Sequence, residues 1–285
     1  MGGTLVHSCG VPSGVLPSLS WIQCVFSVMG TGTLPQSPGS KCGDSLARNV
    51  RRLGIITGMT VEAACFNAAA AELSENTRPL MTSVGGNPQK AKQAARDFAK
   101  TGVAGLVSFG VAGGLDPSLV PGDVVLANAV WLPNGDVIPT HSVWRDAVAT
   151  TSSGLRCFTD LVVAGSDVAV TSAVAKGALF ERSGAVVVDM ESHGVAAAAQ
   201  EAGLPLLVVR VVADPASRAL PEAALAGIGP DGSRRPFAVL AKLLANPMAL
   251  PALIGLAKDS NKALKNLSFI ADSVIQCWSK NAIEN

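Results

Sequence analysis

The sequence predicts an α/β fold, a three-layer sandwich in which helices flank a mixed, mostly parallel central sheet. Short apolar runs, such as the one over 205–215, lack polar alternation and are typical of strands buried on both faces. Alanine-rich or amphipathic segments separate these runs, and such alternation favours a sheet covered by helices on both sides. Hydrophobic residues make up 48% of the chain, which allows a sizeable core.

The regular pattern begins near residue 51. Apolar runs predict strands over 51–59, 78–86, 103–115, 122–133, 160–170 and 205–215, and a further run over 180–191 leads into a helix. Helices are predicted over 62–75, 88–102 and 193–203. The second helix has Pro88 near its start and Gly102 just past its end, where these residue types are preferred. We therefore expect one α/β domain over 51–220.

Both ends of the chain differ from this domain. Residues 1–50 are rich in Gly, Pro and Ser, so we expect either a disordered extension or a start codon assigned too early. The tail over 221–285 predicts short amphipathic helices broken at Pro247 and Pro251. It has no uninterrupted apolar span of about 18 residues, the length that crosses a bilayer. We expect it to lie on a membrane surface, a partner subunit or the core.

The overall composition excludes some functions. The net charge is +1, with 22 basic and 21 acidic residues, and tyrosine is absent. Nucleic-acid binding, which needs a basic stripe or stacking aromatics, is therefore not expected. Six cysteines without a CxxC pair and three scattered histidines predict no metal site.

Polar or glycine residues follow four of the predicted strands. The segments are TGMTVEA (57–63), FGVAGGLDP (109–117), VDMESHG (188–194) and VVADPAS (211–217). The carboxyl ends of parallel strands gather at one edge of an α/β sheet, where ligands bind. We therefore expect these four segments to form a single pocket. The glycines of the second segment either admit a ligand close to the backbone or only form a turn.

Three carboxyl groups in these segments could carry chemistry. The dipole of the helix that begins beside Glu191 favours an ionised carboxylate, so we expect this group to be charged and to bind hydroxyls or stabilise a cation. The alternative is a helix cap. Asp214 follows an apolar run, where burial raises the pKa of a carboxyl and suits a general acid, or it belongs to an Asp-Pro turn. Glu62, taken alone, is either a helix cap or a solvated side chain.

These segments, taken in order, resemble the purine nucleoside phosphorylase and methylthioadenosine/adenosylhomocysteine nucleosidase superfamily. The pieces that carry the resemblance are LGIITGMTVEA, SFGVAGGLDPSLVPGDVVL, VVVDMESHGVA and VVRVVADPAS. The pairing of VDMES with R-x-x-(S/A)-D about twenty residues later is the most specific feature. GIITGMTVEA and the Lys/Arg-bearing tail are most similar to the hopanoid-associated phosphorylase branch, which is linked to adenine removal from adenosylhopane.

The resemblance implies a role for each matching residue. It makes Asp214 the general acid that protonates the leaving base and Glu62 the group that orients the attacking water. Glu191 would hold the ribose hydroxyls and stabilise the sugar cation, with Met190 packed beneath the ribose. Around the glycine turn, substrate contacts are expected from Phe109, Val111 and Gly113. Asp189 is expected to be structural, and His193 either lies near the pocket or caps the helix.

Two departures from the family pattern bear on the reaction. Nucleosidases usually carry serine before the general acid, where this chain has Ala213, so a hydrogen bond that orients Asp214 is missing or comes from elsewhere. Hexameric phosphorylases carry a phosphate-binding arginine and serine around the glycine turn, where this chain has Ser108 and Val111. A phosphate normally needs an arginine, so the sequence favours water as the nucleophile.

The sequence therefore predicts an enzyme that hydrolyses the N-glycosidic bond of a 5′-substituted adenosine, with adenosylhopane as the expected substrate. One alternative is phosphorolysis to a sugar 1-phosphate, with inorganic phosphate as co-substrate and no other cofactor. The other is a nucleoside-binding protein without turnover, which Ala213 leaves open although the presence of Glu191 and Asp214 argues against it. The resemblance implies a homo-oligomer, and we expect a cytoplasmic protein that contacts the inner face of the membrane through its tail.

Overall fold

A computed structural model describes residues 52–284, apart from 222, 223, 225, 228, 230 and 234. The expectation for residues 1–50 lies outside the described residues. The described residues fall in one compact unit.

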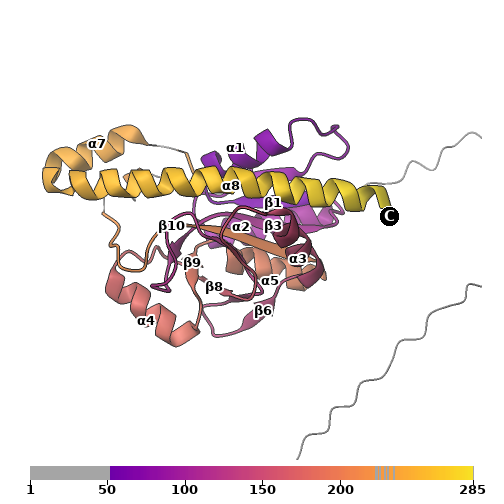
Figure 1. Cartoon of the computed structure of the whole chain (residues 1–285), viewed down its shortest axis with the longest axis horizontal. Coiled ribbons are helices and arrows are strands. Elements are labelled where there is room, and N and C mark those ends of the chain that lie inside the picture. The colour runs from indigo at the N-terminus through magenta and orange to yellow at the C-terminus, as the bar shows by residue number, and fades with distance from the viewer. Residues whose placement is uncertain are drawn as a thin grey trace, which may run out of the picture. The chain divides into compact units, whose positions relative to one another are not determined.

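The strands of the described residues form one mixed sheet of ten strands (Figure 1). They are β1 (Leu53–Thr57), β2 (Leu80–Ser83), β3 (Gly105–Gly114), β4 (Val124–Leu126), β5 (Ala129–Trp131), β6 (Val137–Pro139), β7 (Cys157–Phe158), β8 (Val162–Gly165), β9 (Val187–Asp189) and β10 (Leu206–Asp214). Their order is β6-β5-β8-β9-β3-β10-β4-β7, and β1 pairs with both β2 and β3. The pairs that β3 makes with β1 and β10 are parallel, whereas its pair with β9 is antiparallel.

Helices cover both faces of this sheet. They are α1 (Thr60–Ala69), α2 (Pro88–Lys100), α3 (Ser142–Thr151), α4 (Ala173–Ser183), α5 (Ser192–Ala202), α7 (Pro236–Ala245) and α8 (Leu250–Glu284), with a 3-10 turn η1 (Pro247–Ala249) before the last. Side chains of α2 and α5 share one apolar core with the sheet, and those of α1, α3 and α8 share the other. The predicted three-layer α/β sandwich is therefore confirmed.

The central strand β3 explains why the apolar runs lack alternation. Its Leu106 and Ala112 face the core beneath α2 and α5, whereas Val107 and Phe109 face the core beneath α1 and α8. Both faces are covered, so both sets of side chains are apolar. The neighbouring strand β10 follows β3 in register until its last residues, where a bulge shifts the pairing between Val212 and Asp214.

Several predicted elements are corrected by the structure. The strand predicted over 122–133 is two strands, because the chain leaves β10 after β4 and joins β8 as β5. The strand predicted over 160–170 ends at Gly165, and the residues after it leave the sheet. Helices α3 and α4 were not predicted, because their apolar residues are few and mixed with polar ones.

The tail also differs in part from its prediction. The break at Pro247 is present as η1, but Pro251 lies in the first turn of α8, where a proline costs no helical hydrogen bond. The later part of α8 is buried against the sheet core through Ala263, Leu267 and Ile270. That stretch of the tail therefore packs on the core.

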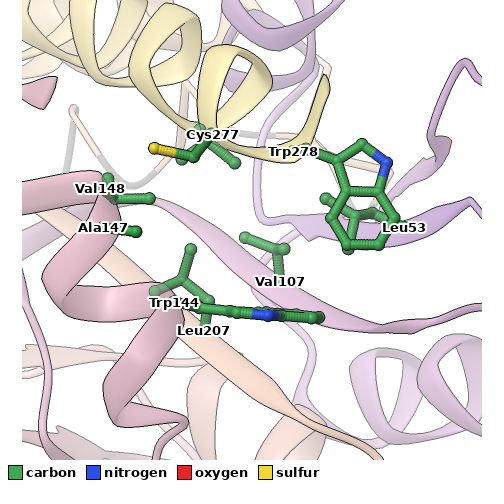
Figure 2. A pocket seen from close by; sticks show the side chains of 9 residues that line it. Leu53, Val107, Trp144, Ala147, Val148, Leu207, Cys277 and Trp278 are labelled. Carbon is green, nitrogen blue, oxygen red and sulfur yellow. The ribbon is translucent and has the colours of Figure 1, made fainter. Parts of the chain in front are cut away.

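A small apolar gap lies where α8 and α3 meet the amino-terminal ends of β1, β3 and β10. Figure 2 shows Trp144 of α3 and Trp278 of α8 reaching this gap, and their ring centroids lie 5.6 Å apart. The gap has a volume of about 20 Å³, which is room for a single water molecule. It is part of the packing between helix and sheet and is too small for a ligand.

Candidate active site

A pocket of about 200 Å³ lies at the carboxyl ends of the central strands. The four predicted segments meet there, together with the loop after β8. The predicted site residues that line it are Glu62, Val111, Gly113, Asp189, Met190, Glu191, Ala213 and Asp214. The prediction of a single pocket at this sheet edge agrees with the structure because β1, β3 and β10 run parallel and end together.

Two predicted residues lie outside the pocket. The Phe109 side chain is fully buried beneath α1, with its ring edge-on to Phe66 at a centroid distance of 4.9 Å, so the expected substrate contact is wrong. Phe109 lies two residues before Val111 in β3, in a part of the strand that helices still cover. His193 lies in the first turn of α5 and pairs with Asp167, with 3.2 Å between His193 Nε2 and Asp167 Oδ1. It therefore does not cap the helix, and it lies near the pocket without lining it, since Asp167 directly precedes Val168 of the lining.

Glu62 is held by backbone amides at the start of α1. Its Oε2 accepts a hydrogen bond from the Met59 amide at 2.8 Å, and its Oε1 accepts one from the Val111 amide at 2.9 Å. A Cβ at Gly110 would lie 2.7 Å from Oε1, so only glycine leaves room for this carboxyl beside β3. Burial raises the pKa of Glu62, although the two amides and the charge of Arg210 oppose that rise.

Glu191 occupies the N-cap position of α5, but its side chain makes no capping hydrogen bond. The carboxyl group lies over Gly58, where a Cβ would be 2.5 Å from Glu191 Oε1. Burial, and next the charge of Asp189, raise the pKa of Glu191 to about 8. Burial thus opposes the helix dipole, which favours the charged form, and the charge of Glu191 stays a prediction.

Asp189 is the residue that caps α5. Its Oδ1 accepts hydrogen bonds from the amides of Glu191 and Ser192 at 2.9 and 2.8 Å, and its Oδ2 contacts the guanidinium of Arg210. Arg210 is 1% exposed and also donates to the hydroxyls of Ser108 and Ser192 at 2.6 and 2.9 Å. Ser108, which matches a phosphate-binding position of the hexameric phosphorylases, thus accepts a hydrogen bond from Arg210 and does not line the pocket.

Arg210 was not predicted as part of the site. It lies in the R-x-x-A-D motif that carried the resemblance, and a charged residue within an otherwise apolar strand was the available signal. Its side chain lies behind Asp189 and does not line the pocket.

Asp214 ends β10 just after the bulge and is 5% exposed. The ammonium of Lys176, from α4, contacts its Oδ2. Burial raises the pKa of Asp214, and Lys176 opposes that rise. Ala213 supplies no side-chain hydrogen bond to Asp214, and the ammonium of Lys176 contacts Asp214 instead. Sequence reasoning missed Lys176, because α4 was not predicted and the lysine carries no motif.

The titratable side chains among the described residues that line the pocket are acidic, and none of these residues is a lysine or arginine. Three cations lie nearby, and each pairs with an aspartate: Arg210 with Asp189, Lys176 with Asp214 and Arg218 with Asp259. Nor do the described residues bring three His, Cys, Asp or Glu side chains together as ligands for a metal ion. The arrangement can donate a proton, hold hydroxyl groups and polarise a water molecule.

The profile of the phosphorylase superfamily matches residues 56–245, more than half of the chain. The chain belongs to the phosphorylase superfamily. This confirms the superfamily that the motifs predict. The match to the superfamily includes all four strand-end segments of the pocket and reaches the end of α7.

Solved structures of similar fold include two 5′-methylthioadenosine/S-adenosylhomocysteine nucleosidases. The protein from Helicobacter pylori has a TM-score of 0.61 and 15% identity, over 82% of this chain and 99% of its own. The protein from Neisseria meningitidis has the same score and identity, over 79% and 99%. Futalosine hydrolase of Helicobacter pylori follows with 0.60 and 15%, over 81% and 98%. At this identity the likeness shows the fold of the superfamily. No curated protein sequence matches the chain.

The raised pKa of Glu191 predicts a dependence of stability on pH. An acid whose pKa is higher in the folded than in the unfolded chain binds more protons when folded, so the folded state loses stability as pH rises. We expect the free energy of unfolding to fall between about pH 4.5 and pH 8 and to level off above it. In Glu191→Gln this fall should be smaller by a few kcal/mol, since each pKa unit is worth about 1.4 kcal/mol.

Urea unfolding at pH 5, 7 and 9 measures this difference. Exposed Glu75 provides the matched control, because Glu75→Gln removes a carboxyl from the surface of the same chain. A pH dependence that is the same in Glu191→Gln and in the unsubstituted protein would show that Glu191 titrates in its ordinary range.

Proposed function

We propose that this protein hydrolyses the N-glycosidic bond of a 5′-substituted adenosine and releases adenine. The observation that carries the proposal is the set of three buried carboxyl groups, Glu62, Glu191 and Asp214, which line one pocket. Among the residues that the structure describes, no lysine or arginine lines this pocket. Cleavage of this bond needs an acid for the leaving base, an anion for the sugar cation and a positioned water. The superfamily to which the chain belongs agrees with glycosyl-bond cleavage.

Asp214 is the proposed general acid. Its proton moves to a ring nitrogen of the purine as the bond between that base and the sugar breaks, and the bonding electrons stay with the base. Burial raises its pKa, which favours the protonated form that this step requires.

Glu191 is the proposed partner of the ribose. In the proposed complex, ribose hydroxyls donate hydrogen bonds to the Glu191 carboxylate, and hydrogen bonds to the charged form lower its pKa from the raised value. The resulting anion stabilises the positive charge that develops on the sugar. Met190, beside it in the pocket lining, is proposed to pack beneath the ribose.

Glu62 is the proposed base for water. The Met59 and Val111 amides fix both of its oxygens, and each oxygen keeps a lone pair for a further donor. Water adds its oxygen to the sugar carbon and gives its proton to Glu62. Within the described part of the pocket lining, a phosphate dianion would meet two carboxyl groups and no lysine or arginine, so water is the favoured nucleophile.

For the 5′ substituent we propose a lipid, adenosylhopane, on the strength of the resemblance to the hopanoid-associated branch. The solved nucleosidases are named for 5′-methylthioadenosine and S-adenosylhomocysteine, which are adenosines substituted at the 5′ position. In this chain Val168, Val170 and Leu220 form an apolar side of the pocket that suits a hydrocarbon substituent.

An apolar surface on the tail supports a lipid substrate. Phe237, Leu244, Met248, Leu250 and Ile254, on α7, η1 and the start of α8, are between 47% and 87% exposed, and we call this set the apolar tip. Exposed apolar groups of this size favour contact with a membrane surface. Among the described helices, none is both long enough and apolar enough to cross a membrane.

The apolar tip adjoins elements of the pocket. The loop before α7 accepts a hydrogen bond at Gly232 from the amide of Thr60, one residue after Met59 of the pocket. Arg218, which follows Asp214 in the chain, contacts Asp259 of α8. We propose that the substrate enters from the side of the protein that carries the tip, and peripheral membrane binding is part of the proposal.

Replacement of Asp214 by asparagine tests the reaction. We expect Asp214→Asn to slow adenine release from 5′-methylthioadenosine or adenosylhopane by about 10²- to 10⁴-fold, the usual loss with a general acid. The assay is chromatographic detection of adenine, and exposed Asp231→Asn is the control. Unchanged release by Asp214→Asn would remove this residue from the mechanism, and no release by the unsubstituted protein would favour a binding protein without turnover.

Vesicle flotation tests the apolar tip. With vesicles that contain anionic lipid, we expect the double variant Phe237→Ser/Met248→Ser to partition at least about a hundredfold less than the unsubstituted protein, because burial of each side chain is worth about 1.5–3 kcal/mol. Val174→Ser removes an equally exposed apolar residue from α4 and should float normally. Equal flotation of all three proteins would contradict membrane contact, and self-association lost only in the double variant would assign the tip to a partner subunit.

A further inference from the structure

Lys176 is a buried cation that lies beside Asp214, the proposed general acid. It lies in the first half of α4, and its side chain is fully buried. The ammonium contacts Asp214 Oδ2 and donates to the carbonyl oxygens of Pro215 and Arg218 at 2.9 and 3.1 Å. No hydrogen bond from the described residues reaches Asp214 Oδ1, which leaves this oxygen for a ligand.

The contacts around Lys176 Nζ suit an ammonium group and not a neutral amine. Three oxygen acceptors surround its nitrogen, and an ammonium group has three N–H donors. A neutral amine would turn its lone pair toward one of these oxygens. The site therefore holds a positive charge, which needs the carboxyl beside it as a partner.

We propose that Lys176 is a positioning residue that fixes Asp214 toward the leaving base and stabilises the carboxylate formed when Asp214 gives up its proton. This role rests on the proposed function. The proton on Asp214 moves to a ring nitrogen of the base, the glycosidic electron pair leaves with the base, and Lys176 keeps its three protons. Asp214 becomes negatively charged as its proton leaves, so the attraction between Lys176 and Asp214 grows along the reaction and lowers the energy of the transition state.

The role also explains Ala213. Ala213 offers no side-chain donor to the neighbouring Asp214, and a direct contact from Lys176 orients the acid instead. The contact comes from α4, an element distant in sequence from β10.

Other charges around Asp214 leave Lys176 as the main cation. Arg218 lowers the pKa of Asp214 and Asp259 raises it, but these two residues pair with each other. Across the pocket, Glu62 and Glu191 are acidic. The loss of the Lys176 charge should therefore raise the pKa of Asp214 further.

The test compares two leaving groups in Lys176→Met. We expect adenine release to fall by about ten- to a hundredfold, while release of 4-nitrophenol from 4-nitrophenyl riboside stays within about threefold, since that group leaves without a proton. The alkaline limb of the adenine pH profile should move to higher pH by about one unit or more, because Asp214 stays protonated longer. Lys176→Arg, which keeps the charge, should leave this limb in place.

A second readout needs no turnover. In Lys176→Met the free energy of unfolding should fall more steeply with rising pH than in the unsubstituted protein, and adding Asp214→Asn should remove the extra slope. Lys176→Gln replaces the methionine variant if that protein does not fold. If neither substrate is cleaved by the unsubstituted protein, the proposed function fails, yet the slope still reports whether Lys176 controls Asp214. An unmoved alkaline limb, equal losses with both leaving groups, or an unchanged slope overturns the role.

Discussion

The buried ion pair between Arg210 and Asp189 is the interaction on which the candidate site depends. It joins β10 to β9, and through the hydroxyls of Ser108 and Ser192 it also holds β3 and the start of α5. Removal of one partner from a buried pair typically costs about 3–5 kcal/mol, because the other charge is left without compensation. Asp189 caps α5 as part of this pair, and that frees the carboxyl of Glu191 for the pocket.

A second buried aspartate of the site, Asp214, is also paired with a cation. Asp214 would be an isolated buried carboxyl at the end of β10, and Lys176 gives it a partner from α4. Each cation lies behind an aspartate, so the pocket itself presents acidic groups while the buried region holds compensating positive charge. Such a site attracts a developing cation on a sugar and disfavours an anionic nucleophile such as phosphate.

The sequence predicts most of the sheet edge, because buried parallel strands leave a clear apolar signal and end in polar residues. Asp214 and Glu191 were found in this way. The raised pKa of Glu191 was not predicted, because it depends on burial against Gly58 and on the nearby charge of Asp189, which only the folded chain shows. Phe109 was placed in the pocket because the sequence shows the glycine turn but not where helices α1 and α8 stop covering β3. Lys176 approaches from a helix whose pattern is weak, and only the folded chain brings it to Asp214.

The central claim is that buried carboxyl groups direct water, and not phosphate, to the sugar. Mass analysis of the sugar product tests it most directly, after incubation of the protein with 5′-methylthioadenosine or adenosylhopane in the presence and absence of saturating inorganic phosphate. The account predicts the free sugar in both buffers, formed at the same rate as adenine. A sugar 1-phosphate, formed only when phosphate is present, would contradict it.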